Sequence, residues 1–439
     1  MPQLLLRLFF SYAASMPPRD IGWMFLDLNS YFAGAEQELQ PHLRGLPVVV
    51  VPVEAETTCC IAVSSQAKAY GIRTGIGLAE ARLLCPHLQV VNARPRLYVE
   101  LHHRLLDAIQ QHVPVEQVMS CDEFAIRLIG RERELECAVE LAYAIKQQIR
   151  QVGRTLRCSI GLAPNRLLAK VAGDMLKPDG LMVLEKHTLP EALYCLDLSD
   201  IPGIGRRMEK RIRAAGITGT RQLCALSRER MSALWGGVLG DRLWLSLRGE
   251  DLPELKPQPR QSLSRQHILA PHARSRETAR AIAIKLLLST ARKMRRGGFC
   301  ARAVGLQVGY QNGRAYDAVI RIPPTTDAWS LQAYMAMLYD KSPTLTPSDL
   351  AVVLADLRSA EQPGLFHTGT DEPADRVTQA IDGINQRYGL HTVYPGSIHA
   401  VRKEAPTRIS FGVPPPLEEF NDPADRLLTN ARLELSGLL

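Results

Sequence analysis

The pattern of apolar and polar residues predicts short buried strands and amphipathic helices in the first part of the chain. The run MFLD at residues 24–27 predicts a buried strand that ends at a carboxylate. Residues 33–39 have helix-forming composition, so Tyr31 and Phe32 are expected at the corner between this strand and a helix. Strands are also predicted at residues 46–53, 116–128 (two short ones) and 157–162, and helices at 78–85, 98–112, 132–152 and 164–175. This succession is typical of a mixed α/β unit.

After residue 181 the sequence changes character, and two further modules are expected. LDLSDIPGIG at residues 196–205 leads into a basic helix and further helices to about residue 247, which indicates a small all-helical domain. Prolines at positions 253, 257 and 259 mark an extended linker. The next elements are a strand from residue 261, a helix at 275–296, strands at 301–310 and 315–322, a helix at 327–340 and a strand at 350–357. This βαββαβ order predicts a four-stranded sheet backed by two helices.

Composition and cysteine usage narrow the class of protein. With 439 residues, 46% hydrophobic and 22% charged, the chain is ordinary for a soluble globular protein of about three domains. Its nine cysteines are scattered and never form a CxxC pair, which argues against a disulfide framework or a zinc site and favours the reducing cytoplasm. The N-terminal LLLRLFF is too short to span a membrane and has no basic region ahead of it. Residues 1–23 are therefore taken as an N-terminal extension, and no membrane partner is expected.

Basic residues concentrate in one segment. Residues 256–361 contain 16 Lys and Arg against 7 Asp and Glu, a net charge of +9 compared with +8 for the whole chain. Arg292, Lys293, Arg295 and Arg296 close the predicted helix at 275–296, where cations also suit the helix dipole, so capping is an alternative to phosphate contact. The excess across the whole segment favours a polyanionic partner.

Three carboxylates lie near the ends of predicted strands. Asp27 ends the first strand, and Asp122 and Glu123 lie in SCDEF at residues 120–124. Carboxylate oxygens are ligands for Mg²⁺, and two such ions about 3.5–4 Å apart can drive phosphoryl transfer. Successive strand residues point to opposite faces, so Asp122 and Glu123 share a site only if the strand ends or twists between them. On the residues alone, surface salt bridges are the more ordinary explanation.

Five motifs, in this order, resemble those of Y-family translesion DNA polymerases of the bacterial DinB and UmuC type. They are DLNSYFAGAE at 27–36, AKAYGIRTG at 67–75, SCDEF at 120–124, CSIGLAPNRLLAKVAGDMLKPDG at 158–180 and IPGIG at 201–205. The resemblance covers residues 24 to about 360 and implies an α+β, right-hand polymerase fold. It implies a palm (24–32 and 98–185), small fingers (33–97), a helical thumb with a helix-hairpin-helix (186–252), a linker (253–260), a βαββαβ little-finger domain (261–360) and a C-terminal tail (361–439).

The resemblance also implies an activity, cofactors and catalytic residues. A template-directed DNA polymerase would join a deoxynucleoside triphosphate (dNTP) to a primer 3′-OH with two Mg²⁺ ions. Asp27, Asp122 and Glu123 would be the catalytic metal ligands, with Asp122 bridging the ions and Glu123 binding one, and the backbone of Leu28 would lie near the second ion. Phe32 falls at the family's steric gate, where its ring would exclude a ribose 2′-OH. A core aromatic is the alternative for Phe32.

The same resemblance assigns residues that contact nucleotide and DNA. Lys68 and Lys177 match triphosphate-binding positions, Ser65 is a candidate hydroxyl donor, and Tyr31 lies beside the gate. The alternatives are a solvated helix face for Lys68, a helix C-terminal cation for Lys177 and core packing for Tyr31. Contacts to the phosphates of primer-template DNA, without sequence readout, are assigned to Gly203, Gly205, Arg265, Arg292, Lys293, Arg295, Arg296 and Arg302.

The chain departs from the family pattern at four positions. Asn29 stands where a second Asp is frequent, Ser65 where Tyr is frequent, Lys68 where Arg is frequent, and Cys121 where an aliphatic residue is usual. None of these is an implied metal ligand. The departures therefore bear on efficiency and lesion preference rather than on catalysis.

Residues from 361 onward are richer in proline and glycine and are expected to form a partly ordered tail. QPGLF at 362–366 resembles a sliding-clamp-binding peptide in which Gln362, Leu365 and Phe366 would bind the clamp; a loop pinned to its own domain is the alternative. AIDGINQRYG at 380–389 is similar to the C-terminal extension of UmuC-type polymerases, which implies accessory damage-response subunits as partners.

Two other functions remain open. One is a catalytically impaired, polymerase-like scaffold that binds DNA and the clamp, although such relatives typically lose the carboxylates. The other is a palm-type nucleotide cyclase, which would need neither a helix-hairpin-helix nor a basic terminal domain.

Overall fold

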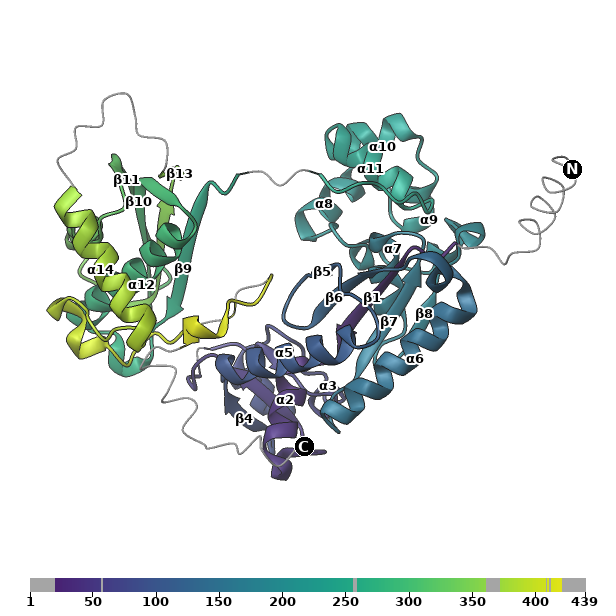
Figure 1. Ribbon diagram of the computed structural model, residues 1–439, viewed down its shortest axis with the longest axis horizontal. Helices are drawn as coiled ribbons and strands as arrows, with labels where there is room; N and C mark the ends of the chain where they lie inside the picture. Colours follow the sequence, from purple (N-terminus) through teal and green to yellow (C-terminus); the bar gives the residue numbers. More distant parts are fainter. Residues whose placement is uncertain are drawn as a thin grey trace, which may run out of the picture.

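The structure is a computed structural model that describes residues 20–56, 58–255, 259–360, 372–407, 409 and 412–420. Its N-terminal module is built on a five-stranded sheet with Asp27 in the central strand (Figure 1). The strands, in spatial order, are β5 (Gln117–Val118), β6 (Glu123–Arg127), β1 (Trp23–Leu28), β7 (Cys158–Ala163) and β8 (Leu181–Val183). β1 pairs antiparallel with both of its neighbours. The predicted apolar strand is confirmed, and Asp27 lies inside it, one residue before its end.

Helices cover both faces of this sheet, which explains the unbroken apolar run in β1. Met24 and Leu26 are buried in a core with α5 (Pro95–Gln110) and α6 (Leu135–Val152). Phe25 packs on the opposite face in a core with α7 (Arg166–Met175). Because side chains alternate along a strand, Asp27 shares the α7 face with Phe25.

A smaller α/β unit follows β1 in the chain. Its elements are α2 (Tyr31–Leu39), η1 (Pro41–Leu43), β2 (Val48–Val51), β3 (Ala62–Val63), α3 (Ser65–Lys68), α4 (Leu78–Leu84) and β4 (Gln89–Asn92). The three strands form a sheet in the order β3-β2-β4. All four valines of β2 are fully buried, as expected for a β-branched run in the middle of a sheet.

The helical module predicted after residue 181 is confirmed. Its elements are α8 (Arg206–Ala214), α9 (Thr220–Cys224), α10 (Arg228–Trp235) and α11 (Val238–Ser246). Short 3₁₀ helices lead into it, namely η3 (Lys186–Thr188), η4 (Glu191–Leu193) and η5 (Leu198–Asp200), while η2 (Gly130–Arg133) precedes α6. Ile201, Ile204 and Ile212 belong to the same apolar core as α7, so this module packs on the α7 side of the first sheet.

The predicted βαββαβ module is also confirmed. Its elements are β9 (Ser262–Ile268), η6 (Pro271–Ala273), α12 (Arg276–Arg296), β10 (Phe299–Tyr310), β11 (Ala315–Thr325), α13 (Ala328–Asp340), β12 (Pro347–Ala355) and β13 (Arg358–Ser359). The main strands form an antiparallel sheet in the order β11-β10-β12-β9. Val304 and Val352 pack with α12 and α13 on one face. Gly305, Val353 and Ser264 are aligned on the other face.

Residues 372–407 form an ordered part of the tail that was expected to be partly ordered. This part folds onto the terminal module as α14 (Glu372–Tyr388) and η7 (Gly396–Val401), and η8 (Leu417–Phe420) follows. Figure 1 shows α14 beside α12. Ile398 is fully buried, and the ammonium of Lys285 donates to the carbonyl oxygens of Arg402 (2.8 Å) and Glu404 (2.6 Å). Proline and glycine content, averaged over the whole tail, hides the helical spacing within α14. None of the helices in the described part of the chain is long and apolar enough to span a membrane.

Candidate active site

The three predicted carboxylates come together at one end of the central strands. Asp27 is directly opposite Glu123 of β6 and Ser159 of β7. Residues directly opposite in an antiparallel pair project to the same face, so Asp27 and Glu123 share the α7 side. Asp122 precedes β6, and its carbonyl oxygen accepts a hydrogen bond from the N–H of Leu28 (2.8 Å). β6 begins at Glu123, so Asp122 lies just outside the strand. The two residues therefore do not have to point to opposite faces, which allows them to share a site.

Burial and mutual repulsion perturb two of these carboxylates. Burial raises the pKa of Asp27 to about 6, although the nearby charge of Lys177 opposes the rise and that of Asp122 adds to it. Burial also raises the pKa of Asp122; a hydrogen bond from Ser120 opposes this shift, and the charge of Glu123 adds to it. Two crowded, partly desolvated carboxylates favour a cation between them.

Two lysines from the α7 region hold these carboxylates. The Lys177 ammonium lies 2.8 Å from Oδ2 of Asp27 and 2.7 Å from Oδ1 of Asp174. Lys170 forms an ion pair with Glu123, and its ammonium lies 5.1 Å from the ring centroid of Phe25.

The donor set suits Mg²⁺ in chemistry, but the three side chains do not converge on one point. Within the described ranges, no three Asp, Glu, His or Cys side chains are close enough to hold one metal ion. Asp27 and Asp122 fit a hard divalent cation, because they are neighbouring, largely buried oxygen donors. Glu123 points to Lys170 and would have to leave it to join them.

Phe32 lies against the ring of Tyr98 and beside a cavity. It lies in the first turn of α2, and its ring stacks on that of Tyr98 with centroids 4.5 Å apart. Phe32 and Tyr98 also line a cavity of about 380 Å³, together with Ile61 and Gln266. Tyr31 is buried, and its hydroxyl donates to the backbone oxygen of Tyr98 (2.7 Å). This burial and hydrogen bond favour the packing role for Tyr31, which is the alternative given above.

A buried polar group fixes the ring beneath Phe32. The Tyr98 hydroxyl donates to Oε1 of Glu36 (2.6 Å), and Arg94 binds the same carboxylate through Nε (3.0 Å) and a second nitrogen. Glu36 is fully buried, and these donors supply its carboxylate with hydrogen bonds in place of water. Sequence analysis missed this group, which joins α2 to α5.

Lys68 and Ser65 lie in α3 of the smaller α/β unit. Partial burial and the charge of Lys177 lower the pKa of Lys68, while the charge of Asp27 opposes that shift. The two ammonium groups and the Asp27 carboxylate therefore act on one another. Ser65 is exposed at the first position of α3, where the preceding Ser64 caps the helix by accepting from the N–H of Ala67.

The glycines of IPGIG form the turn that enters α8. Gly203 has φ of +96°, a left-handed conformation that glycine adopts without strain. Gly205 is the N-cap of α8, and both glycines are exposed. Ile201 and Ile204 are buried and anchor the turn.

The basic residues assigned to DNA do not form one open surface. Two nitrogens of Arg295 donate to Asp382 of α14 at 2.7 and 2.9 Å, so this guanidinium is paired within the protein, and its assignment to DNA stays a prediction. The other pairs are Arg265 with Glu419 at 3.6 Å, Arg296 with Glu418 and Glu419 at 4.0 Å, and Arg302 with Asp356 at 3.7 Å. Arg292 lines a cavity of about 60 Å³ beside α14, and burial lowers its pKa, whereas Lys293 is half-buried on α12. The net charge of +9 covers residues 256–361 and leaves out the acidic partners Asp382, Glu418 and Glu419.

Further polar residues near the site were not assigned a role from the sequence. Lys170 binds Glu123, and Lys146, Asp179 and Asn29 form a cluster beside Asp27. The burial of Lys146 could have been inferred from its position, because it lies on the same face of α6 as the buried residues Ala142, Ile145 and Ile149. The proposed clamp-binding residues Gln362, Leu365 and Phe366 lie outside the described residues.

Comparisons with known proteins match the N-terminal part and the terminal module of the chain. Residues 26–174 match the impB/mucB/samB family, and residues 260–365 match the C-terminal domain of that family. DNA polymerase IV of Moorella thermoacetica is 32% identical over 86% of this chain and 96% of its own length. DNA polymerase IV of Desulfatibacillum aliphaticivorans is 29% identical over 85% of this chain and 96% of its own length.

Solved structures share the fold. A Y-family DNA polymerase chimera of Dbh and Dpo4 superposes with a TM-score of 0.61 at 21% identity, covering 76% of this chain and 98% of its own. Dbh DNA polymerase in an insertion ternary complex has a TM-score of 0.51 at 21% identity, with the same coverage.

Proposed function

This chain belongs to the Y-family, or impB/mucB/samB family, of DNA polymerases, and we infer that it is a template-directed DNA polymerase of the translesion type. Its substrates are primer-template DNA and a dNTP, and it transfers the nucleotide to a primer 3′-OH. The observation that carries this function is the pairing of Asp27 with Glu123 across β1 and β6, with Asp122 directly before β6. A scaffold that had lost catalysis would have no reason to retain this arrangement of carboxylates.

We propose that Asp27, Asp122, Glu123 and the backbone of Leu28 hold two Mg²⁺ ions. When bound, the ions would stabilise charge on the attacking and leaving oxygens of phosphoryl transfer. Asp27 and Asp122 supply the buried oxygen donors. Glu123 would leave its ion pair with Lys170 to join them.

The nucleotide would lie between the carboxylates and α3. Lys68 and Lys177 would neutralise triphosphate oxygens, which is supported by their mutual electrostatic influence and by that of Asp27. Ser65 would donate a hydroxyl from the same helix. Phe32 would exclude the 2′-OH of a ribonucleotide, supported by its exposure to a cavity and its rigid platform on Tyr98.

DNA contacts are proposed on the helical and terminal modules. The turn at Gly203 and Gly205 presents exposed backbone to a phosphate. The domain boundaries given in the sequence analysis stay as proposed, with residues 24–32 and 98–185 as palm, 33–97 as fingers, 186–252 as thumb and 261–360 as little finger. A sliding clamp and accessory damage-response subunits remain proposed partners, and the cytoplasm the proposed compartment.

Primer extension with purified protein tests this function. The double variant Asp122→Asn and Glu123→Gln should lose extension in Mg²⁺, because the metal ligands lose their charge. The matched control is Asp107→Asn with Glu140→Gln, two exposed carboxylates on α5 and α6. Equal extension by wild type and the site variant would sink the catalytic assignment. A wild-type protein that binds primer-template DNA but never extends it would support the scaffold alternative.

A further inference from the structure

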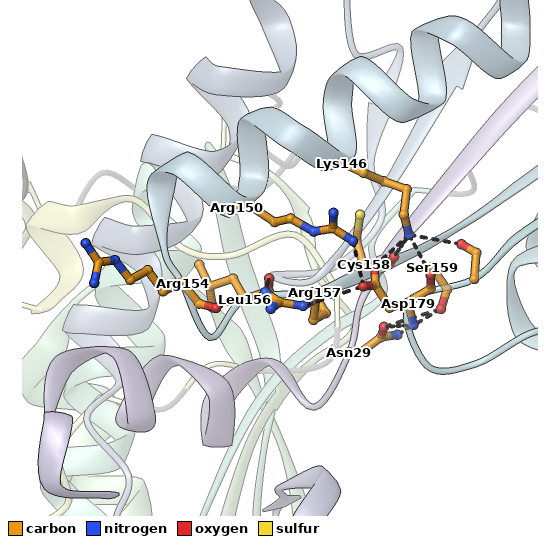
Figure 2. Close-up of polar contacts among 10 residues, drawn as sticks. Asn29, Lys146, Arg150, Arg154, Leu156, Arg157, Cys158, Ser159 and Asp179 are labelled. Atoms are coloured by element: carbon orange, nitrogen blue, oxygen red, sulfur yellow. Dashed lines mark hydrogen bonds and ion pairs between the residues drawn. The ribbon is translucent and has the colours of Figure 1, made fainter. Parts of the chain in front are cut away.

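A buried lysine on α6 binds the loop between α7 and β8. The side chain of Lys146 is 5% exposed, and its ammonium lies 2.7 Å from Oδ1 of Asp179 (Figure 2). It also donates to the backbone oxygens of Cys158 (2.6 Å), Asp179 (2.9 Å) and Gly180 (3.2 Å). A buried ammonium is costly unless it is paired and hydrogen-bonded, so this lysine requires the loop to stay in place.

Asp179 is the residue through which the loop is held. Its φ of +56° is left-handed, which an aspartate adopts only when local contacts support it. Arg150 binds Oδ2 of Asp179 at 2.8 Å, and Arg157 approaches the same atom at 3.5 Å. The backbone N–H of Asp179 donates to Oδ1 of Asn29 at 2.7 Å.

Asn29 ties this loop to the strands that carry the catalytic carboxylate. Its Nδ2 donates to Oγ of Ser159 at 3.1 Å, and Ser159 is the cross-strand partner of Asp27. Figure 2 shows Asn29, Ser159 and Lys146 gathered around Asp179. The loop and Asp27 are therefore both attached to the same part of the sheet, at the paired ends of β1 and β7.

Gly180 shows that the loop has little room to change. A Cβ atom at this position would lie 1.8 Å from the carbonyl oxygen of Leu176. The backbone from Leu176 to Gly180 thus folds back closely on itself. Lys177 lies within this turn, two residues before Asp179, and reaches Asp27 at 2.8 Å.

We propose that Lys146, Asp179 and Asn29 are positioning residues that set the Leu176–Gly180 loop so that the Lys177 ammonium faces Asp27 and the triphosphate of the incoming dNTP. This inference rests on the proposed function. A lysine side chain is a flexible four-carbon stem, so it does not fix its own ammonium in space. The position of the backbone therefore decides which groups the ammonium can reach. Small displacements of a positioning group are costly in catalysis.

The proposal also gives a physical reason for asparagine at position 29. The amide accepts from Asp179 through Oδ1 and donates to Ser159 through Nδ2. An aspartate could accept from Asp179 but could not donate to Ser159, and it would bring a third carboxylate close to those of Asp179 and Asp27. Asn29→Asp should therefore loosen the loop.

Equilibrium dNTP binding tests this role without requiring turnover. The dissociation constant of a dNTP is measured on protein bound to a primer-template whose primer ends in a dideoxynucleotide, with Mg²⁺ present. Lys146→Met keeps the length of the side chain and removes its charge. It should weaken dNTP binding about 10-fold, the effect of misplacing one charged phosphate contact, while binding of the primer-template itself stays within about 2-fold.

Lys285→Met is the matched control, because Lys285 is 1% exposed and also donates to backbone carbonyl oxygens, but in the terminal module. It should leave dNTP binding within about 2-fold of wild type. In a double variant with Lys177→Met, the Lys146→Met change should add less than about 2-fold, since both act through one ammonium.

Equal dNTP binding by the Lys146→Met and Lys285→Met proteins, or effects of Lys146→Met and Lys177→Met that simply multiply, would overturn the proposal. Where Lys146→Met does not fold, Asn29→Asp carries the same comparison and is expected to weaken dNTP binding in the same direction. Primer extension by the wild type is measured separately. Its failure refutes the polymerase function, whereas the binding comparison judges the positioning role.

Discussion

Tyr98 has two tasks in this structure, and two substitutions separate them. Its ring stacks on Phe32 with centroids 4.5 Å apart, and its hydroxyl donates to the buried Glu36 at 2.6 Å. Tyr98→Phe keeps the ring and removes the hydroxyl, whereas Tyr98→Leu removes both. If Phe32 is the steric gate, only Tyr98→Leu should change the choice between deoxyribonucleotides and ribonucleotides.

The two effects have different sizes. Tyr98→Phe loses a hydrogen bond to a charged group, worth about 1.5–3 kcal/mol, while Glu36 keeps Arg94 and Gln40 as donors. In a cooperative unit of 150–250 residues this corresponds to a fall in Tm of roughly 3–12 °C. An aromatic pair contributes about 0.5–1.5 kcal/mol, so loss of the stacking should reduce sugar discrimination by roughly 2- to 12-fold.

The assay is the ratio of kcat/KM for a dNTP to that for the matching ribonucleotide, together with thermal melting of each variant. Phe32→Ala serves as the reference for a lost gate. Tyr339→Leu is the control, because Tyr339 is also buried but lies in the terminal module. Discrimination that falls equally in Tyr98→Phe and Tyr98→Leu, or that stays at the wild-type value in Tyr98→Leu while Phe32→Ala loses it, would refute the reasoning.

Three other substitutions test the fold and its charges. Asp327 caps α13 by accepting from the N–H groups of Trp329 (3.1 Å) and Ser330 (2.7 Å), so Asp327→Ala should cost about 0.5–2 kcal/mol in urea unfolding at pH 7. Burial alone would raise the pKa of Asp327, but these hydrogen bonds hold that pKa below its ordinary value. The stability that the cap contributes is therefore fully present above about pH 4 and is lost as pH falls through the lower pKa of the folded state. A difference in unfolding free energy between wild type and Asp327→Ala that is undiminished at about pH 2 would contradict this. Arg295→Met should lower stability and leave the salt dependence of DNA binding unchanged, because Arg295 is bound to Asp382, and a slope reduced by about 0.9 would restore its role as a phosphate contact. Gly161→Ala should destabilise the protein by about 1–3 kcal/mol or more, since a Cβ there would lie 2.0 Å from the carbonyl oxygen of Ala169, and unchanged urea unfolding would show that α7 can move away from β7.

Most strands and helices that build the three sheets and cover them are predictable from the sequence, because burial leaves regular spacings. β2 lies in the middle of its sheet, so a run of valines suffices to predict it. The βαββαβ order follows from alternating period-two and period-3.6 patterns. The position of Asp27 near the end of β1 follows in the same way, whereas its proximity to Asp122 and Glu123 depends on pairing that only the resemblance implied.

Other features could not be predicted because they depend on contacts between distant segments. Arg295 and Asp382 are separated by 87 residues, and nothing local indicates that the arginine binds α14 rather than a phosphate. Asp179 and Asn29 are separated by 150 residues, and their contact is set by how β1 and β7 pair. A lysine on the apolar face of α6 was a usable sign that Lys146 is buried and paired, because a buried ammonium requires acceptors.

The charges near Asp27 indicate that nucleotide and metal binding depend on each other. Lys177 is shared between Asp27 and Asp174, and the charges of Lys177 and Asp27 also act on Lys68. A triphosphate would compete with these carboxylates for both ammonium groups. If Asp27 and Asp122 bind a divalent cation, Asp27 can exchange Lys177 for that cation, and Lys177 becomes available to the triphosphate. By linkage, each ligand should then tighten the binding of the other, so a dNTP should bind more weakly without Mg²⁺, and this difference should shrink in Lys177→Met.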